Sequence, residues 1–292
     1  MRFEACPCCG ASDFYDFYCN PQHKEVTTAH EFAYGGSSYI RRLTKCRVCA
    51  YAFSDDACED YFRFYTMDKT TVVDDSQAGK KRYFQSVIRM AGDVLTHTGA
   101  AIRGDKSLLD IGAGNGAFIN ELVKAGFAGP IDAVELNDQS SRNLLATARN
   151  VYSTIEHCSA AGSRYDVITM FDFLEHVLDP RHFLQGLQGI SHADTVYIIG
   201  VPRMDSLISR MLGHKYWLYT PMHYSYFSRP GLQALLGSLF TSVSIEKSPW
   251  ETGPLSGALK WLGFDIELAG DISITVPHAS SYICVCSDRI SL

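Results

Sequence analysis

The stretch LLDIGAGNGAF, from Leu108 to Phe118, decides the fold. An apolar run leads into three glycines at alternate positions, and the single acid of the stretch, Asp110, stands two residues before the first glycine. Glycine lets the backbone approach a ligand closely where a strand turns into a helix. The stretch therefore predicts a buried strand, a tight turn and a helix, with a ligand at the carboxyl edge of a parallel sheet.

Short apolar runs alternate with helix-period segments from Lys106 onward. This alternation is typical of a parallel sheet wrapped by helices. The expected strands are 107–112, 131–136, 151–157, 165–171, 195–201, 241–247 and 281–287. They predict an α/β fold with a seven-stranded, doubly wound, Rossmann-like sheet. The piece from Pro249 to Val276 fits no element of this scheme.

Caps and spacing predict the helices of this domain. One helix ends near Gly126, another begins at the pair Asp179-Pro180, and a third opens at Ser228. The first of them is expected to bury Phe118, Ile119, Leu122 and Val123. A lead-in helix before the domain is expected from the apolar spacing of Phe84, Val87, Ile88, Ala91, Val94 and Leu95.

Seven of the ten cysteines lie in the first 58 residues. CPCCG and CRVC place Cys6, Cys9, Cys46 and Cys49 in two Cys-x-x-Cys pairs, with 36 residues between the pairs. Two such pairs complete a tetrahedral four-thiolate site, so we predict structural Zn²⁺ in a small zinc-ribbon-like module. Cys8 and Cys19 allow a different ligand set. The predicted parts are a zinc-binding module (1–60), a linker with the lead-in helix (61–105) and the sheet domain (106–292).

Composition narrows the class of protein. The chain has 292 residues, 46% of them hydrophobic, and a formal net charge of -6, which disfavours nucleic acid as a partner. It has no run of the roughly 18 to 20 apolar residues that a membrane span needs, and its N-terminus has no apolar core typical of a secretion signal. We expect a cytoplasmic protein with reduced thiols and no membrane partner. The oligomeric state stays open.

The glycine turn alone does not distinguish two cofactors. GAGNGA is close to the dinucleotide pattern, and Glu135 lies 19 residues beyond Gly116, where an acid that binds ribose is expected. Asp110 separates the two, because a carboxylate repels the pyrophosphate of a dinucleotide. S-adenosylmethionine carries a sulfonium and an ammonium group instead of phosphates, and an acid attracts both.

Four motifs in order, LLDIGAGNGAF, VEL, YDVITMFDFLEHVLDP and HYSYFSRPGLQALL, resemble class I S-adenosylmethionine-dependent methyltransferases, in particular the small-molecule branch with a Leu-Glu-His motif. The resemblance covers about Lys106 to Ser287. It implies that Asp110, Gly112 and Gly114 hold the methionine end of S-adenosylmethionine and that Glu135 accepts hydrogen bonds from the ribose hydroxyls. It also implies that Phe171 and Asp172 border the cofactor pocket. The adenine site is less clear, with Cys158 and its neighbours as candidates.

A histidine beside the cofactor suits removal of a proton from the methyl acceptor, because its pKa lies near working pH. His176 is the first candidate for this base and His223 is the second. The alternative is that His176 only supports the loop, and Glu175 either orients a neighbour or caps a helix. The aromatic run is expected to be mostly core, with one or two rings at a ligand; it contains Tyr216, Trp217, Tyr219, Tyr224, Tyr226 and Phe227.

The predicted function is transfer of a methyl group from S-adenosylmethionine to a small-molecule acceptor, on oxygen first and on carbon or nitrogen second. The cysteine module resembles the zinc segment of some methyltransferases, including sugar C-methyltransferases, whose further C-terminal domain this chain is too short to contain. A ribosomal RNA methyltransferase is an alternative that the acidic charge balance disfavours. An oxidoreductase and a non-catalytic adaptor with a vestigial cofactor fold are the competing classes.

Overall fold

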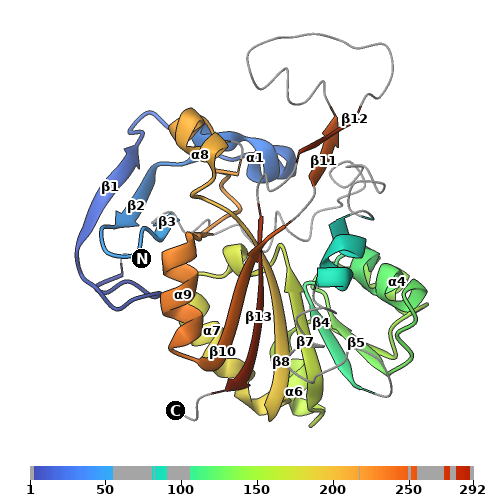
Figure 1. The fold of residues 1–292 in the computed structure, drawn as a ribbon. Helices are drawn as coiled ribbons and strands as arrows, with labels where there is room; N and C mark the ends of the chain where they lie inside the picture. The colour runs from blue at the N-terminus through green and yellow to red at the C-terminus, as the bar shows by residue number, and fades with distance from the viewer. Residues whose placement is uncertain are drawn as a thin grey trace.

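A seven-stranded sheet forms the centre of the molecule (Figure 1). The computed structural model describes residues 3–54, 81, 83–90, 106–216, 218–248, 251–254, 273–276 and 281–289. In spatial order the strands are β10-β13-β8-β7-β4-β5-β6. Their bounds are Phe240–Lys247, Ser281–Arg289, Ser191–Pro202, Tyr165–Phe171, Leu108–Ile111, Ile131–Val134 and Asn150–Tyr152. The predicted seven-stranded, doubly wound sheet is confirmed.

The order of the strands reverses between β4 and β7. From β4 the chain continues through β5 and β6 to one edge, and from β7 it continues through β8 toward the other. These five strands are parallel; β13 pairs antiparallel with β8, and β10 pairs antiparallel with β13, so β10 runs in the same direction as the five. In an open α/β sheet, ligands bind at the carboxyl ends of the strands at such a reversal. Asp110 on β4 lies at this position.

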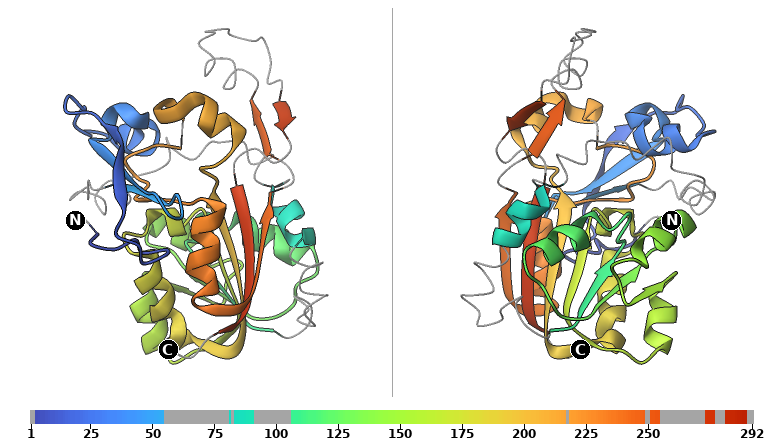
Figure 2. Two further views of the ribbon diagram at one scale, coloured as in Figure 1. Left: turned by 60° about the vertical axis from the view of Figure 1, so that its left-hand side comes forward. Right: turned by 90° about the vertical axis from the view of Figure 1, so that its right-hand side faces the viewer.

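Helices cover both faces of the sheet (Figure 2). They are α4 (Ala117–Lys124), α5 (Asp138–Leu144), α6 (Ile155–Ala160), α7 (Pro180–Gly186) and α9 (Arg229–Gly237), with a further helical segment at 83–90. Successive side chains of a strand point to opposite faces, so β4 places Leu108 in the core beneath α4 and Leu109 in the core beneath α7 and α9. The sheet therefore has an apolar layer on each side.

The predicted helix starts are confirmed at two caps. The Asp179 side chain accepts a 3.0 Å hydrogen bond from the His182 amide at the start of α7. The Ser228 side chain accepts one of 3.1 Å from the Gly231 amide at the start of α9. Short polar side chains satisfy amides that the first turn of a helix leaves unpaired.

Two local predictions were wrong. Val123, expected on the buried face of α4, is 45% exposed. The strand expected over 151–157 ends at Tyr152, because Thr154 caps α6 by accepting a hydrogen bond from the amide of His157. Where the residue pattern of a strand overlaps a helix cap, the cap ends the strand early.

The N-terminal module is built on a second, smaller sheet. It contains β1 (Phe14–Cys19), β2 (Arg42–Cys46) and β3 (Ala52–Ser54) in that order, and its fourth strand is β9 (Ser225–Tyr226) from the other domain. Helix α1 (Ala29–Tyr34) and the 3-10 helix η1 (Gly36–Tyr39) connect β1 to β2. Figure 1 shows the module beside α8 (Leu207–Leu212), toward the carboxyl ends of the parallel strands.

Short elements complete the described chain. They are η3 (Leu174–His176), η4 (Leu187–Ile190) and η5 (Gly213–Lys215), together with the antiparallel pair β11 (Glu251–Pro254) and β12 (Ser273–Val276) inside the piece that the sequence left unassigned. Several predicted positions lie outside the described residues: Cys58, Ala91, Val94, Leu95 and Trp217. Among the helices that the structure describes, none is both long and apolar enough to cross a membrane.

Candidate active site

Asp110 is buried at the point where the strand order reverses. Its Oδ1 accepts a 2.7 Å hydrogen bond from the Thr169 hydroxyl on the neighbouring strand β7. Burial raises the pKa of Asp110 to about 7; the Thr169 hydrogen bond lowers it, and the nearby Glu135 charge raises it. A cationic group of a ligand would stabilise the ionised form of this carboxyl group, whereas a phosphate would not.

The glycine turn that follows has a backbone that other residues rarely adopt. Gly112, Gly114 and Gly116 have φ angles of 73°, 55° and 79°. A Cβ at Gly112 would lie 2.5 Å from the Phe173 ring, so this ring needs a glycine beneath it. A Cβ at Gly114 would meet nothing within 4 Å, so only its left-handed backbone argues for glycine there.

Glu135 holds the turn from the end of β5. Its Oε2 accepts a 2.8 Å hydrogen bond from the amide of Gly114, and its Oε1 accepts one of 2.8 Å from the amide of Asn137. The residue is only 2% exposed. Each carboxylate oxygen has a second lone pair, so both can still accept hydrogen bonds from ligand hydroxyls. The structure thus brings the two predicted acids, Asp110 and Glu135, to one turn.

Of the aromatic residues at the end of β7 and just after it, one lies in the core and one lies at the site. The Phe171 ring lies 4.6 Å from that of Phe118 and 5.4 Å from that of Phe84, centroid to centroid, within the core beneath α4. Asp172 is exposed, has a φ of 50°, and donates its amide to Gly200 O at 3.1 Å. Sequence reasoning missed Phe173, which packs over Gly112; the close approach at this glycine is visible only in three dimensions.

Three ionisable side chains meet next to this segment. One ligand atom each of Glu175, His176 and His223 lies within 4.8 Å of the others, and the two imidazole rings are 4.8 Å apart. His176 belongs to η3 and is half-buried, whereas His223 belongs to the loop before β9 and is buried. All three predicted catalytic residues are therefore in one group, although His223 is 47 residues from His176 in the sequence.

Backbone carbonyls orient both imidazoles. His176 Nδ1 lies 2.9 Å from Met222 O and His223 Nδ1 lies 2.8 Å from Leu218 O, so each Nδ1 donates its hydrogen. Burial and, to a smaller extent, the neighbouring His176 lower the pKa of His223 to about 3, against the opposing effect of the Leu218 carbonyl. Burial raises the pKa of Glu175, and the charge of Asp172 adds to this effect. Sequence reasoning could not identify Leu218 and Met222, because they contribute only backbone atoms.

The profile of a family described as methyltransferase domain matches residues 81–238, more than half of the chain. The chain belongs to this methyltransferase family. The identification from sequence motifs of an S-adenosylmethionine-dependent methyltransferase is confirmed, and so is the predicted Rossmann-like fold. A search of curated proteins gives no match for this sequence.

Solved structures are similar to this chain at low sequence identity. The plantazolicin methyltransferase BpumL, in complex with a monoazolic desmethylPZN analog and SAH, is 15% identical; the match covers 73% of this chain and 86% of that one, with a TM-score of 0.51. The YcgJ protein of Bacillus subtilis is 14% identical over 71% of this chain and 99% of that one, with a TM-score of 0.49. A SAM-dependent methyltransferase of Archaeoglobus fulgidus is 16% identical, with coverages of 68% and 94% and a TM-score of 0.46.

The N-terminal module of the methyltransferase supports the loop that carries His223. Strand β3 pairs with β9, with Phe53 opposite Ser225, and the Ser54 amide donates a 3.0 Å hydrogen bond to Tyr224 O. Tyr224 directly follows His223 in the sequence. The module is therefore part of the wall of the candidate site, across the predicted boundary between the first and third parts of the chain.

Arg181 ties the same module to the helices of the sheet domain. From α7 it donates 2.8 Å hydrogen bonds to the carbonyl oxygens of Pro7 and Cys8, and its third contact is a 2.7 Å hydrogen bond to Ser238 Oγ. At the start of α9, Ser228 Oγ donates a 2.6 Å hydrogen bond to Cys49 O. Both loops of the cysteine cluster are thus bonded to the methyltransferase domain.

The four predicted metal-ligating cysteines form one cluster. The Sγ atoms of Cys6 and Cys49 are 3.6 Å apart, as are those of Cys9 and Cys46. Zinc–sulfur bonds of about 2.3 Å in a tetrahedron place sulfurs roughly 3.8 Å apart, close to the observed spacing. All four cysteines are free of disulfides. Cys8 is not in the cluster, and neither is the exposed Cys19 at the end of β1.

Other predicted ligand contacts belong to the core. Cys158 is fully buried, with its Sγ 3.5 Å from the Tyr165 hydroxyl. The aromatic run is also internal: its described rings are all at most 4% exposed, namely Tyr216, Tyr219, Tyr224, Tyr226 and Phe227. The expectation that most of this run is core packing is confirmed for these residues.

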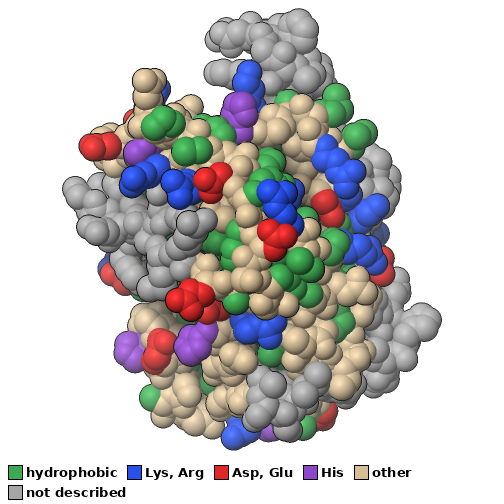
Figure 3. All heavy atoms as spheres, turned by 90° about the vertical axis from the view of Figure 1, so that its left-hand side faces the viewer, with side chains coloured by type: hydrophobic (Ala, Val, Ile, Leu, Met, Phe, Trp, Pro, Cys, Tyr) green, Lys and Arg blue, Asp and Glu red, His purple; other side chains and the backbone are tan. Residues whose placement is uncertain are grey.

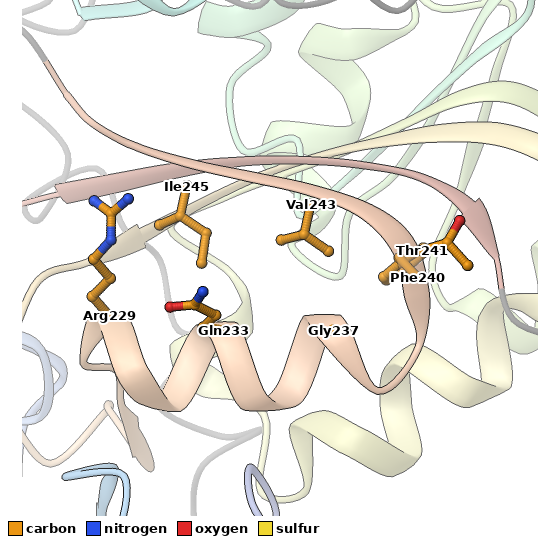
Figure 4. Close-up of a pocket in the computed structure, with 7 residues that line it drawn as sticks. All are labelled: Arg229, Gln233, Gly237, Phe240, Thr241, Val243 and Ile245. Carbon is orange, nitrogen blue, oxygen red and sulfur yellow. The ribbon is translucent and has the colours of Figure 1, made fainter.

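A surface groove of about 470 Å³ lies elsewhere, between α9 and the edge strand β10 (Figure 4). Its lining is mixed, with the apolar Val243 and Ile245 on the strand and the polar Gln233 and charged Arg229 on the helix. None of the predicted site residues is among the described residues that line it.

Proposed function

We propose that the chain is an S-adenosylmethionine-dependent methyltransferase that methylates an oxygen of a small-molecule acceptor. The observation that carries the proposal is the pair of buried acids, Asp110 and Glu135, at the glycine turn. A dinucleotide would bring its pyrophosphate to this turn, where these carboxyl groups repel it. The sulfonium and ammonium groups of S-adenosylmethionine are attracted instead.

The roles of the cofactor-binding residues follow from their positions. Asp110, Gly112 and Gly114 hold the methionine end, and Glu135 accepts hydrogen bonds from the two ribose hydroxyls. Phe171 and Asp172 border the pocket from the end of β7, with Phe171 acting through the rings packed around it. Glu135 suits its role because two backbone amides already fix the carboxylate.

Methyl transfer is an in-line displacement, so the enzyme mainly aligns donor and acceptor and excludes water. A hydroxyl acceptor must also lose its proton. We assign this step to His176, because it is the half-buried member of the group and its Nε2 has a lone pair in the tautomer that Met222 O selects. His223 lies next to it, with ring centroids 4.8 Å apart, and Glu175 is the third member of the group.

A small-molecule acceptor agrees with two observations. The structural neighbour BpumL binds SAH together with a desmethylPZN analog, a modified natural product rather than a nucleic acid. On the side of the molecule that carries the module, acidic and basic side chains are interspersed, with no single basic surface (Figure 3). Nucleic-acid binding relies on a clustered basic patch, so this face does not favour an RNA substrate.

The cysteine cluster would hold one structural Zn²⁺. Cys6, Cys9, Cys46 and Cys49 supply four thiolates, the donor set of closed structural sites, and no position stays open for a substrate. Thiolates of this kind suit a reducing compartment, which agrees with a cytoplasmic location. The ion would fix the two loops that Arg181 and Ser228 bind.

Calorimetric titration with S-adenosylmethionine, S-adenosylhomocysteine and NAD⁺ tests the cofactor directly. We expect binding of the first two and none of the third. Binding of NAD⁺ alone would identify an oxidoreductase, and binding of none would favour the adaptor. A screen of metabolites for uptake of a labelled methyl group, followed by mass analysis of the product, then identifies the acceptor and the methylated atom.

A further inference from the structure

The geometry points to a metal site that is separate from the cysteine cluster. We propose that Glu175, His176 and His223 bind one divalent transition-metal ion of the Zn²⁺ or Fe²⁺ class. One ligand atom of each residue lies within 4.8 Å of the others. An ion bonded at about 2.1 Å to all three would bring these atoms to roughly 3 to 3.5 Å from one another. Small side-chain rotations close this difference.

The Glu175 carboxylate supplies the first argument for an ion. The residue is 1% exposed, and among the described residues its Oε2 has no hydrogen-bond partner. A buried carboxylate oxygen without a partner is costly, so such groups in proteins are normally paired, hydrogen-bonded or bound to a metal. The charge of Asp172 makes an unpaired anion here still less favourable. A divalent cation between Glu175 and the two histidines satisfies this oxygen.

The two imidazoles supply the second argument. Each Nδ1 donates its hydrogen to a carbonyl oxygen, His176 to Met222 and His223 to Leu218. In that tautomer Nε2 is the ring nitrogen that carries the lone pair. Metal-ligating histidines usually hydrogen-bond a carbonyl or carboxylate through their other ring nitrogen, which fixes the ring. Both histidines therefore already have the outer contacts of metal ligands.

The donor set indicates the kind of ion. Two imidazoles and one carboxylate, with further positions open, are the ligands of catalytic zinc sites and of non-haem iron(II) sites. The four-cysteine cluster differs in ligand type and in accessibility, because all four of its ligands are sulfur atoms and no coordination position stays open. The chain would then hold two ions of different function.

The chemical role of the second ion rests on the proposed function, whereas its binding does not. An acceptor hydroxyl that coordinates the ion loses its proton to water more readily, since a bound cation lowers the pKa of its oxygen ligand. The resulting alkoxide forms a bond to the methyl carbon of S-adenosylmethionine, the sulfur–methyl bond breaks, and neutral S-adenosylhomocysteine leaves. With the ion bound, His176 is a ligand; its role as a base applies to the metal-free enzyme.

Cobalt substitution of the full-length protein tests the site. The protein is loaded with Co²⁺, dialysed against metal-free buffer and assayed for cobalt per chain and for its visible spectrum. We expect two Co²⁺ per chain: one with strong thiolate-to-cobalt absorption from the cysteines, and one with only weak bands from nitrogen and oxygen ligands. One Co²⁺ per chain in the unaltered protein would overturn the proposal.

Variants assign the second ion. His223→Gln and Glu175→Gln should each reduce cobalt from two ions to one and keep the thiolate band, which shows that the module is folded. The exposed His182 provides the matched control, and His182→Gln should keep both ions. Two ions in either site variant would refute the assignment. Calorimetry with S-adenosylhomocysteine separates this test from the proposed function: binding of the cofactor product with one metal refutes only the second site, and two metals without this binding refute only the methyltransferase proposal.

Discussion

The hydroxyl groups of Tyr51 and Ser225 lie 2.7 Å apart, although 174 positions separate the two residues in the chain. Ser225 Oγ donates a 2.9 Å hydrogen bond to Val177 O, so the Tyr51 hydroxyl is the donor to Ser225. Val177 directly follows His176, and Ser225 is two residues after His223. These two hydrogen bonds therefore connect the cysteine module to the two segments that carry the candidate catalytic histidines.

Removing the Tyr51 hydroxyl should loosen this connection. Tyr51→Phe keeps the buried ring and loses one hydrogen bond, so we expect a loss of about 1 kcal/mol in the free energy of unfolding. Turnover should fall while affinity for S-adenosylhomocysteine stays unchanged. Urea unfolding, calorimetry and a methyl-transfer assay measure the three quantities. Tyr15→Phe, in the partly exposed β1, is the control; equal turnover in both variants would show that the contact does not position the histidines.

Glu135→Ala should weaken binding of S-adenosylhomocysteine by at least about tenfold, or about 1.4 kcal/mol, because the ribose hydroxyls and the Gly114 amide lose their acceptor. Calorimetric titration measures the change. Asp138→Ala removes an exposed acid three residues further on and should leave affinity as it is. Unchanged affinity in Glu135→Ala would remove the ribose assignment.

Asp110 should make stability depend on pH. Its pKa rises from the ordinary aspartate value of 3.8 to about 7 in the folded chain, so the folded state binds more protons than the unfolded state between these values. The stabilising effect is complete below about pH 4 and is lost as pH rises through 7, by up to a few kcal/mol. Relative to Asp110→Asn, the unaltered protein should therefore lose stability from pH 4 to 7. Urea unfolding over this range measures both proteins, and parallel curves would contradict the shifted pKa.

His176→Ala should slow methyl transfer by about a hundredfold and spare cofactor binding, because the residue acts on the acceptor. The readouts are labelled-methyl transfer at saturating cofactor and calorimetry with S-adenosylhomocysteine. His182→Ala is the control on a neighbouring exposed histidine. Turnover equal to that of the unaltered protein would leave His176 with only a structural role.

Cys46→Ser should lower the zinc content by one ion per chain and destabilise the module, because zinc binding and the folding of such a site are coupled. The exposed Cys19 offers the control, and Cys19→Ser should change neither quantity. Metal analysis by mass spectrometry and thermal unfolding provide the measurements. A folded Cys46→Ser protein with unchanged zinc would refute the four-thiolate site.

Features that depend on neighbouring residues could be predicted from the sequence. The glycine turn after β4, the caps at Asp179 and Ser228, and the two Cys-x-x-Cys loops each result from a short pattern with one stable geometry. The seven strands were likewise readable from apolar runs. Local patterns failed where two overlapped, as at Thr154, where the helix cap ended the strand.

Contacts between distant segments could not be predicted in this way. No periodicity links Phe53 to Ser225, Arg181 to Pro7 or Glu175 to His223, because such contacts arise from the path of the chain across the sheet. The sequence therefore supplied the candidate acids, histidines and cysteines one by one. In the folded chain the two histidines lie in one group with Glu175, which is 1% exposed and whose pKa is raised by burial and by the charge of Asp172.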